Sequence, residues 1–197
     1  MRRYMFYNTF PTRDSSFELE KREYPVVNIT HIETDLGLMV VAATNKGICM
    51  FEFADYKQLE LELRQLNEAF NAPLVQGDSP HFNTLKEQIE QYFRGERRTF
   101  DIPLDLAGTE FQKQVWLSLL QIPYGCTTTY AKQAELLGNR SAVRAVANAN
   151  GKNKISIILP CHRVIGTNGS LTGYGGGIWR KEKLLELERK NIEIVSV

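Results

Sequence analysis

An apolar run that ends at a proline, with a cysteine and a histidine directly after it, constrains this chain more than any other stretch. Ile157, Ile158 and Leu159 predict a short buried strand. Pro160 should end that strand, because proline has no N–H to donate within a sheet. We therefore expect Cys161 to leave the core at the mouth of a pocket rather than inside a sheet.

The Cys161–His162 pair has two interpretations. A thiol becomes a strong nucleophile when it loses its proton, and a nearby imidazole can take that proton. The alternative is that Cys161 is a small buried hydrophobic residue without chemistry. Neighbours in an extended chain point in opposite directions. His162 therefore reaches Cys161 only if the backbone turns, or through a water molecule.

The composition is that of an ordinary globular protein in a reducing compartment. Of the 197 residues, 43% are hydrophobic and 24% are charged, which allows a substantial core. The three cysteines are unevenly spaced and form no CxxC pair, which argues against a disulfide framework. We expect a cytoplasmic protein with no signal peptide, no membrane segment and no metal site.

Charge is divided unevenly along the chain. Residues 1–106 hold 12 Lys/Arg and 17 Asp/Glu, whereas residues 107–197 hold 12 Lys/Arg and 6 Asp/Glu. A basic half joined to an acidic half suggests that the second half faces DNA. Chance segregation of surface charge is the alternative.

The first half has the pattern of a small α/β domain. Residues 38–43 and 48–53 predict a hairpin around the turn at residues 45–47. Apolar residues at helical spacing predict helices over 56–70 and 81–93, and residues 100–104 predict a short strand. Residues 1–26 are polar and irregular, which is typical of a tail or a loose first strand. Nothing in this half suggests chemistry.

The second half predicts a helix-turn-helix after a linker at residues 103–108. Thr109 and Gln112 form a capping box for the first helix of this half. Further helices are expected over 130–137, capped by Thr129, and over 142–150, capped by Ser141. Two short helices joined by a glycine turn are typical of a helix-turn-helix, although a helical hairpin without a DNA role has the same pattern.

The C-terminal residues 166–197 combine a glycine-rich loop with a final helix. Residues 166–177 could form a flexible surface loop or could close over a flat ligand. The final helix is expected over 178–190. Glu188 lies near its apolar stripe, where a carboxylate is costly unless it is paired.

Several separate motifs resemble the O6-alkylguanine-DNA alkyltransferases, over residues 107–189 closely and more weakly from Gly37. They are Gly108-Thr109-Glu110-Phe111, Gln114-Val115-Trp116, Ile122-Pro123-Tyr124-Gly125, Arg144-Ala145-Val146, Pro160 to Val164, Gly173-Tyr174 and Arg180-Lys181. The resemblance implies a ribonuclease-H-like α/β domain over residues 1–103. It also implies a mostly helical, winged-helix-like domain with the helix-turn-helix over residues 107–197.

The resemblance also implies a role for each matching residue in direct repair of alkylated DNA. Cys161 would accept the alkyl group irreversibly. His162 would deprotonate Cys161 through a water molecule, and Glu188 would orient His162. Asn153 would brace the turn before the cysteine, and Arg144 would enter the duplex where the damaged nucleotide has left.

Other matching positions would hold the flipped-out base. Tyr130 would lie near the target phosphate and donate to guanine N3. The Val164 carbonyl would accept from the guanine amino group, Gly175 N–H would donate to O6, and Tyr174 would wall the pocket. Asn150, with Ser156, stands where human-type relatives have other side chains, so the preference among alkyl groups stays open.

The resemblance implies double-stranded DNA containing O6-alkylguanine, and also O4-alkylthymine, as the substrate. It implies a monomer that needs no cofactor and contacts no membrane. Two other classes stay open on the residues alone. A non-catalytic winged-helix lesion binder would keep Arg144 and Tyr130 without needing His162 or Glu188. A cysteine hydrolase would need a separate oxyanion hole and repeated turnover.

Overall fold

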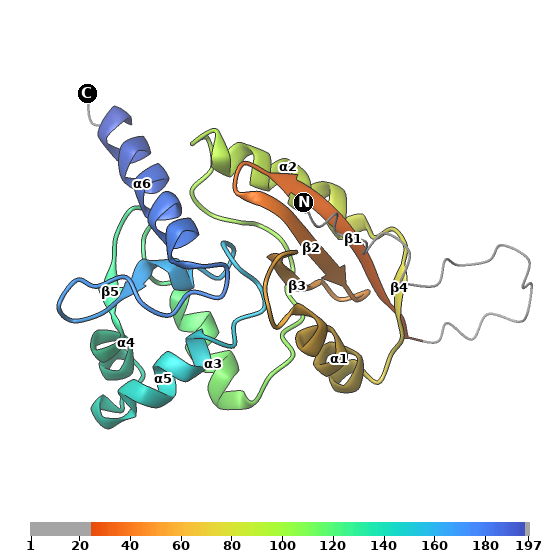
Figure 1. Ribbon diagram of the computed structural model, residues 1–197, viewed down its shortest axis with the longest axis horizontal. Helices are drawn as coiled ribbons and strands as arrows, with labels where there is room; N and C mark the ends of the chain where they lie inside the picture. The colour runs from red at the N-terminus through yellow and green to blue at the C-terminus, as the bar shows by residue number, and fades with distance from the viewer. Residues whose placement is uncertain (1–24, 196–197) are drawn as a thin grey trace, which may run out of the picture.

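The computed structural model describes residues 25–195 of the chain. Its first half holds a four-stranded sheet in the order β3-β2-β1-β4 (Figure 1). The strands are β1 (Val27–Thr34), β2 (Gly37–Ala43), β3 (Ile48–Phe53) and β4 (Leu74–Gln76). β1, β2 and β3 are antiparallel neighbours, and β4 pairs parallel to β1. The predicted hairpin is confirmed, whereas β1 and β4 were not foreseen.

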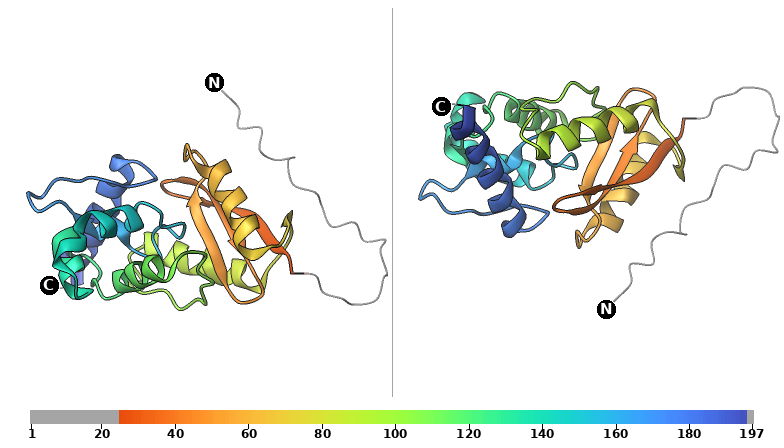
Figure 2. Two further views of the ribbon diagram at one scale, coloured as in Figure 1. Left: turned by 90° about the horizontal axis from the view of Figure 1, so that it is seen from below. Right: turned by 90° about the horizontal axis from the view of Figure 1, so that it is seen from above.

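Two helices cover opposite faces of this sheet (Figure 2). α1 (Leu59–Phe70) packs Leu59 and Leu66 against one face. α2 (Pro80–Phe93) turns Phe82, Leu85, Ile89 and Tyr92 towards the other face. The apolar spacing that predicted both helices is confirmed. α1 begins three residues later than expected because residues 54–58 form turns.

The second half is mostly helical, as expected. It contains α3 (Glu110–Leu119), α4 (Tyr130–Leu136), α5 (Val143–Asn150) and α6 (Ile178–Val195). It also contains the short strands β5 (Thr128–Thr129) and β6 (Val164–Ile165), which pair in parallel. The Thr109 capping box and the Thr129 cap are both present.

Several local predictions in the second half are wrong. Ser141 does not cap a helix, because residues 140–142 form the 3-10 helix η1, capped by Asn139. Phe111, which its helical spacing with Val115 and Leu119 predicts on the apolar face of α3, points outward and is 40% exposed. The last helix continues past residue 190 to Val195. The tail expected over residues 1–26 lies almost entirely outside the described residues.

Two strand predictions, over residues 100–104 and over residues 157–159, are also wrong. Residues 100–104 contribute one isolated bridge, between Leu104 and Ile48. Residues 156–159 form turns instead of a strand, and Ile157 has a φ of 71°. The burial that the apolar pattern predicts is confirmed, because all three apolar residues before Pro160 are at most 3% exposed. A buried turn and a buried strand have the same apolar composition, so the sequence pattern does not separate them.

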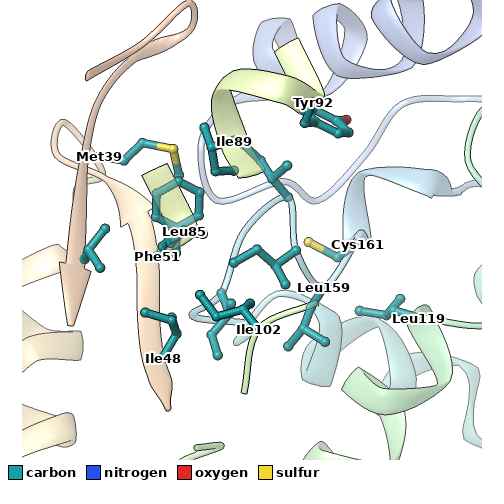
Figure 3. Packing of buried hydrophobic residues seen from close by; sticks show 14 of the residues in the cluster. Met39, Ile48, Phe51, Leu85, Ile89, Tyr92, Ile102, Leu119, Leu159 and Cys161 are labelled. Atoms are coloured by element: carbon teal, nitrogen blue, oxygen red, sulfur yellow. The ribbon is translucent and has the colours of Figure 1, made fainter. Parts of the chain in front are cut away.

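One hydrophobic cluster joins the two halves of the chain. It combines the α2 face of the sheet with Trp116 and Leu119 of α3 and Leu184 of α6. Figure 3 shows Cys161 beside Leu159 within this cluster, facing side chains of α2 and β3. The acceptor candidate therefore lies where both halves meet, and the N-terminal half helps to build its surroundings.

Candidate active site

Cys161 opens the 3-10 helix η2 (Cys161–Arg163), directly after Pro160. The residue is 6% exposed. Burial, the largest influence, raises the pKa of the Cys161 thiol to about 11, although the Asn153 amide partly offsets it. At neutral pH this thiol is protonated, so it needs a base before it can attack.

The turn before Cys161 is organised by the Asn153 side chain. Its Nδ2 donates to the Leu159 carbonyl at 2.9 Å and lies 3.3 Å from Cys161 Sγ. Its Oδ1 accepts from the Ile155 N–H at 3.0 Å. One buried amide thus satisfies backbone groups that a strand would have paired in a ladder. The arrangement explains why this apolar segment forms a turn.

Glu188 is the centre of a buried polar cluster beside the thiol. His162 Nε2 lies 2.8 Å from Glu188 Oε1, and both side chains are fully buried. Tyr92 of α2 donates to the same oxygen at 2.7 Å. The Gly125 N–H donates to Oε2 at 2.9 Å. Arg163 donates through Nε and Nη2 to the same carboxylate at 2.9–3.2 Å.

The charge states follow from these contacts. Burial alone would raise the pKa of Glu188, but hydrogen bonds and charge from His162 and Arg163 lower it to about 2. Burial lowers the pKa of His162, against the opposing pull of Glu188. We therefore assign a neutral His162 that donates from Nε2 to an ionised Glu188. Nδ1 then carries a lone pair, and it has no hydrogen-bond partner among the described residues.

Sequence reasoning missed Tyr92, Arg163 and Lys181. Arg163 could have been found, because a buried Glu188 requires a cation and Arg163 directly follows His162. Lys181 is fully buried and donates to the carbonyls of Val164 and Thr172 at 2.6 and 2.8 Å. Burial lowers its pKa to about 8. Tyr92 lies in the other half of the chain, and no local signal links it to residue 188.

The residues expected to hold the base surround this cluster. Tyr130 begins α4, and its hydroxyl donates to the Thr172 carbonyl at 3.1 Å. Tyr174 is buried, with its ring 6.5 Å from that of His162, whereas Gly175 is exposed. The Val164 carbonyl already accepts from Lys181, and its second lone pair can accept another donor.

The other two expected residues lie on α5. Arg144 is exposed and forms no hydrogen bond or ion pair with the described part of the chain. Asn150 is buried and donates to Gln133 of α4 at 2.6 Å. Asn150 therefore ties α5 to α4 within the helix-turn-helix.

Comparisons with known proteins agree over both halves of the chain. Residues 27–106 match the model of the 6-O-methylguanine DNA methyltransferase ribonuclease-like domain, and residues 110–190 match that of the family's DNA binding domain. A methylated-DNA–protein-cysteine methyltransferase of Methanosarcina acetivorans is 55% identical over 159 residues, covering 79% of this chain and 94% of that protein. The chain belongs to the 6-O-methylguanine DNA methyltransferase family.

Further relatives of this methyltransferase family support the same conclusion. The Mycobacterium tuberculosis methylated-DNA–protein-cysteine methyltransferase is 55% identical over 112 residues, which is 57% of this chain and 68% of that protein. The crystal structure of Mycobacterium tuberculosis OGT in complex with DNA superposes with a TM-score of 0.72 at 40% identity, covering 84% of this chain and 94% of that one. The expected fold class and the expected activity, alkyl transfer from DNA to a protein cysteine, are confirmed.

The Glu188 cluster predicts a large loss of stability when the buried Arg163 is replaced. Arg163→Met removes the guanidinium and leaves a buried carboxylate without its cation. We expect the free energy of unfolding to fall by about 3 kcal/mol, as for other broken buried ion pairs. Urea unfolding of both proteins measures the difference. Arg94→Met is the matched control, because its pair with Glu96 is exposed and should contribute nothing measurable. Equal losses in the two variants would contradict the assignment.

Proposed function

We propose that Cys161 accepts an alkyl group from O6 of a guanine in double-stranded DNA and retains it as a thioether. The observation that carries this proposal is the line of groups behind the thiol. A buried cysteine, a neutral imidazole and an ionised carboxylate stand together in a chain of the methyltransferase family. A carboxylate that orients an imidazole, which in turn serves a nucleophile, follows the logic of catalytic triads.

His162 acts as the base in this scheme. Glu188 holds the Nε2 proton, so the lone pair lies on Nδ1. We assign a bridging water between Nδ1 and the Cys161 thiol, because no hydrogen bond joins His162 directly to the sulfur. The proton passes from sulfur to that water as the water gives its own proton to Nδ1. The ionised Glu188 then stabilises the resulting imidazolium.

The thiolate attacks the alkyl carbon in line with the bond to O6. The sulfur–carbon bond forms as the carbon–oxygen bond breaks, and the electron pair leaves on guanine. The Tyr130 hydroxyl and the Gly175 N–H would stabilise this developing charge by donating to N3 and O6. Tyr130 must turn from Thr172, its present acceptor, to do so.

The alkylated base must leave the duplex before Cys161 can reach it. Arg144 is suited to fill the space that the base leaves, because it projects from α5 among small side chains. The relative crystallised with DNA supports DNA as the partner of the helix-turn-helix.

We further propose O4-alkylthymine as a second substrate and the cytoplasm as the site of action, consistent with three free cysteines. None of the described helices is long and apolar enough to cross a membrane.

A serine in place of the acceptor tests this proposal. Cys161→Ser should abolish transfer of a radiolabelled methyl group from an O6-methylguanine duplex to the protein. DNA binding should be nearly unchanged, because the acceptor is 6% exposed and lies outside α5, the second helix of the helix-turn-helix. Cys126→Ser, at an exposed free cysteine, is the control and should transfer normally. A labelled Cys161→Ser protein would overturn the assignment, and an unlabelled wild type that still binds the lesion would favour the lesion-binder class.

A further inference from the structure

A second buried carboxyl group lies at the edge of the sheet, outside the Glu188 cluster. Glu52 of β3 is 2% exposed. Its Oε2 accepts from the Ser156 hydroxyl at 2.9 Å, and its Oε1 accepts from the Phe53 N–H at 2.8 Å. No ion pair with a described residue compensates this carboxyl group. A buried acid with two neutral donors and no cation needs an explanation beyond stability.

The contacts of Ser156 place Glu52 on the acceptor side of the molecule. The backbone of residues 154–156 runs along β3. The Phe51 N–H donates to the Lys154 carbonyl and the Ser156 N–H donates to the Phe51 carbonyl, both at 2.8 Å. Five residues after Ser156 the chain reaches Cys161. This segment therefore connects the edge of the sheet directly to Cys161.

Tyr174 closes the same region from the glycine-rich loop. Its ring lies edge-on to both Phe53 and His162, at 6.5 Å in each case. A Cβ on Gly176 would lie 2.4 Å from the Phe53 ring, so only glycine allows the loop to approach this closely. We call Glu52, Ser156 and the Tyr174 hydroxyl the polar wall.

The electrostatics around Glu52 come from several elements. Burial raises the pKa of Glu52 to about 8; its two hydrogen bonds and Arg180 of α6 oppose the rise, and Glu62 of α1 adds to it. Arg180 is itself paired with Asp55 at 2.7 Å. Burial is the largest cause that raises the pKa of Cys161 and of Tyr174, and the charge of Glu52 is a smaller cause in the same direction for both. The field of Glu52 therefore reaches the acceptor sulfur.

We infer that the polar wall sorts transferable alkyl groups by charge, with Glu52 as the specificity-determining residue. The inference rests on the proposed function of Cys161. With Glu52 neutral, the wall accepts both neutral and anionic alkyl groups. With Glu52 ionised, it repels an anionic group such as carboxymethyl while leaving methyl transfer unaffected. The same sulfur–carbon bond forms and the same guanine leaves in both cases.

The test compares single-turnover rates on duplexes carrying O6-methylguanine and O6-carboxymethylguanine. The ratio of carboxymethyl to methyl rates cancels the shared dependence on Cys161 and His162. From pH 6 to pH 9 this ratio should fall in the wild type by roughly tenfold, the change expected when an ionised Glu52 disfavours an anionic group by about 1.4 kcal/mol. Lys181 also loses charge in this range, since burial lowers its pKa to about 8.

Glu52→Gln separates the two groups. It keeps the shape of the side chain while removing the charge, and its amide can accept from the Phe53 N–H and donate to the Ser156 hydroxyl. Lys181 is unchanged in this variant. At pH 9 its carboxymethyl-to-methyl ratio should exceed that of the wild type by roughly tenfold, and at pH 6 the two should agree. Glu68→Gln is the control: Glu68 is an exposed glutamate on α1, and it is not among the charges that act on Glu52. It should leave the ratio at the wild-type value.

The outcomes separate this inference from the proposed function. Methyl transfer by wild type with an unchanged ratio in Glu52→Gln overturns the polar wall alone. Absence of methyl transfer in the wild type overturns both. Ser156→Ala provides a second variant: it removes a donor to the charged form, so the fall in the ratio should move to higher pH. A fall that stays at the same pH counts against Glu52.

Discussion

We expect replacement of His162 with alanine to slow methyl transfer at pH 7 by about 10²–10⁴-fold, the range typical of losing a general base. The thiol explains the size of this effect, because burial raises the pKa of Cys161 to about 11 and leaves little thiolate at neutral pH. Without the imidazole, hydroxide must remove the proton. The rate of the variant should therefore rise close to tenfold per pH unit between pH 7 and pH 9, whereas the wild type changes less.

His81→Ala is the matched control for this measurement. His81 lies in the first turn of α2, remote from Glu188, so its loss should leave the rate and its pH dependence unchanged. Circular dichroism establishes that both variants are folded. A His162→Ala protein with the wild-type rate and a flat pH profile would show that the imidazole does not serve the thiol.

We expect alkylation of Cys161 to lower the stability of the protein. Cys161 is 6% exposed within the core cluster, and Asn153 Nδ2 lies 3.3 Å from its sulfur. A methyl group must displace neighbours, and such overpacking typically lowers the free energy of unfolding by about 1–3 kcal/mol. Each kcal/mol corresponds to a shift in Tm of about 2–4 °C for a chain of this size. Thermal unfolding before and after reaction with one equivalent of O6-methylguanine DNA measures the shift.

Asn153 should transmit much of this loss, because its Nδ2 holds both the sulfur and the Leu159 carbonyl. The Asn153→Ala protein lacks this brace and starts from a lower Tm. Its methylation should therefore cause a smaller further shift than methylation of the wild type. Equal shifts in the two proteins would mean that the added methyl group does not act through the Asn153 turn.

The helices and the hairpin could be predicted because their apolar spacing and capping residues are local. Thr109 with Gln112 marks the start of α3 in the sequence and in the structure. The segment before Cys161 could not be predicted in the same way. Its turn depends on the Asn153 side chain, whose hydrogen bonds take the place of those in a sheet. The apolar run itself contains no signal for these hydrogen bonds.

The residues of the candidate site likewise fall into those that local sequence indicated and those that only the structure revealed. Cys161, His162 and Glu188 came from adjacent residues and from a carboxylate that needed a partner. Tyr92 and Glu52 came to light only in three dimensions, because the N-terminal half contributes them from α2 and β3. That half carries no chemical motif, yet it supplies a hydrogen bond to Glu188 and a carboxyl group near the acceptor. Contacts between residues 96 positions apart, as for Tyr92 and Glu188, leave no periodic signal.

The number of lesions repaired per protein molecule tests the central claim, that Cys161 accepts an alkyl group and keeps it. A known amount of protein is incubated with excess O6-methylguanine duplex, and restored guanine is counted against protein until the reaction stops. Mass spectrometry locates the added methyl group. We predict a plateau near one lesion per chain, with the methyl group on Cys161. The plateau is expected because the site offers no activated nucleophile that could remove the methyl group from the thioether. Continued turnover, or a methyl group on Cys49 or Cys126, would contradict it.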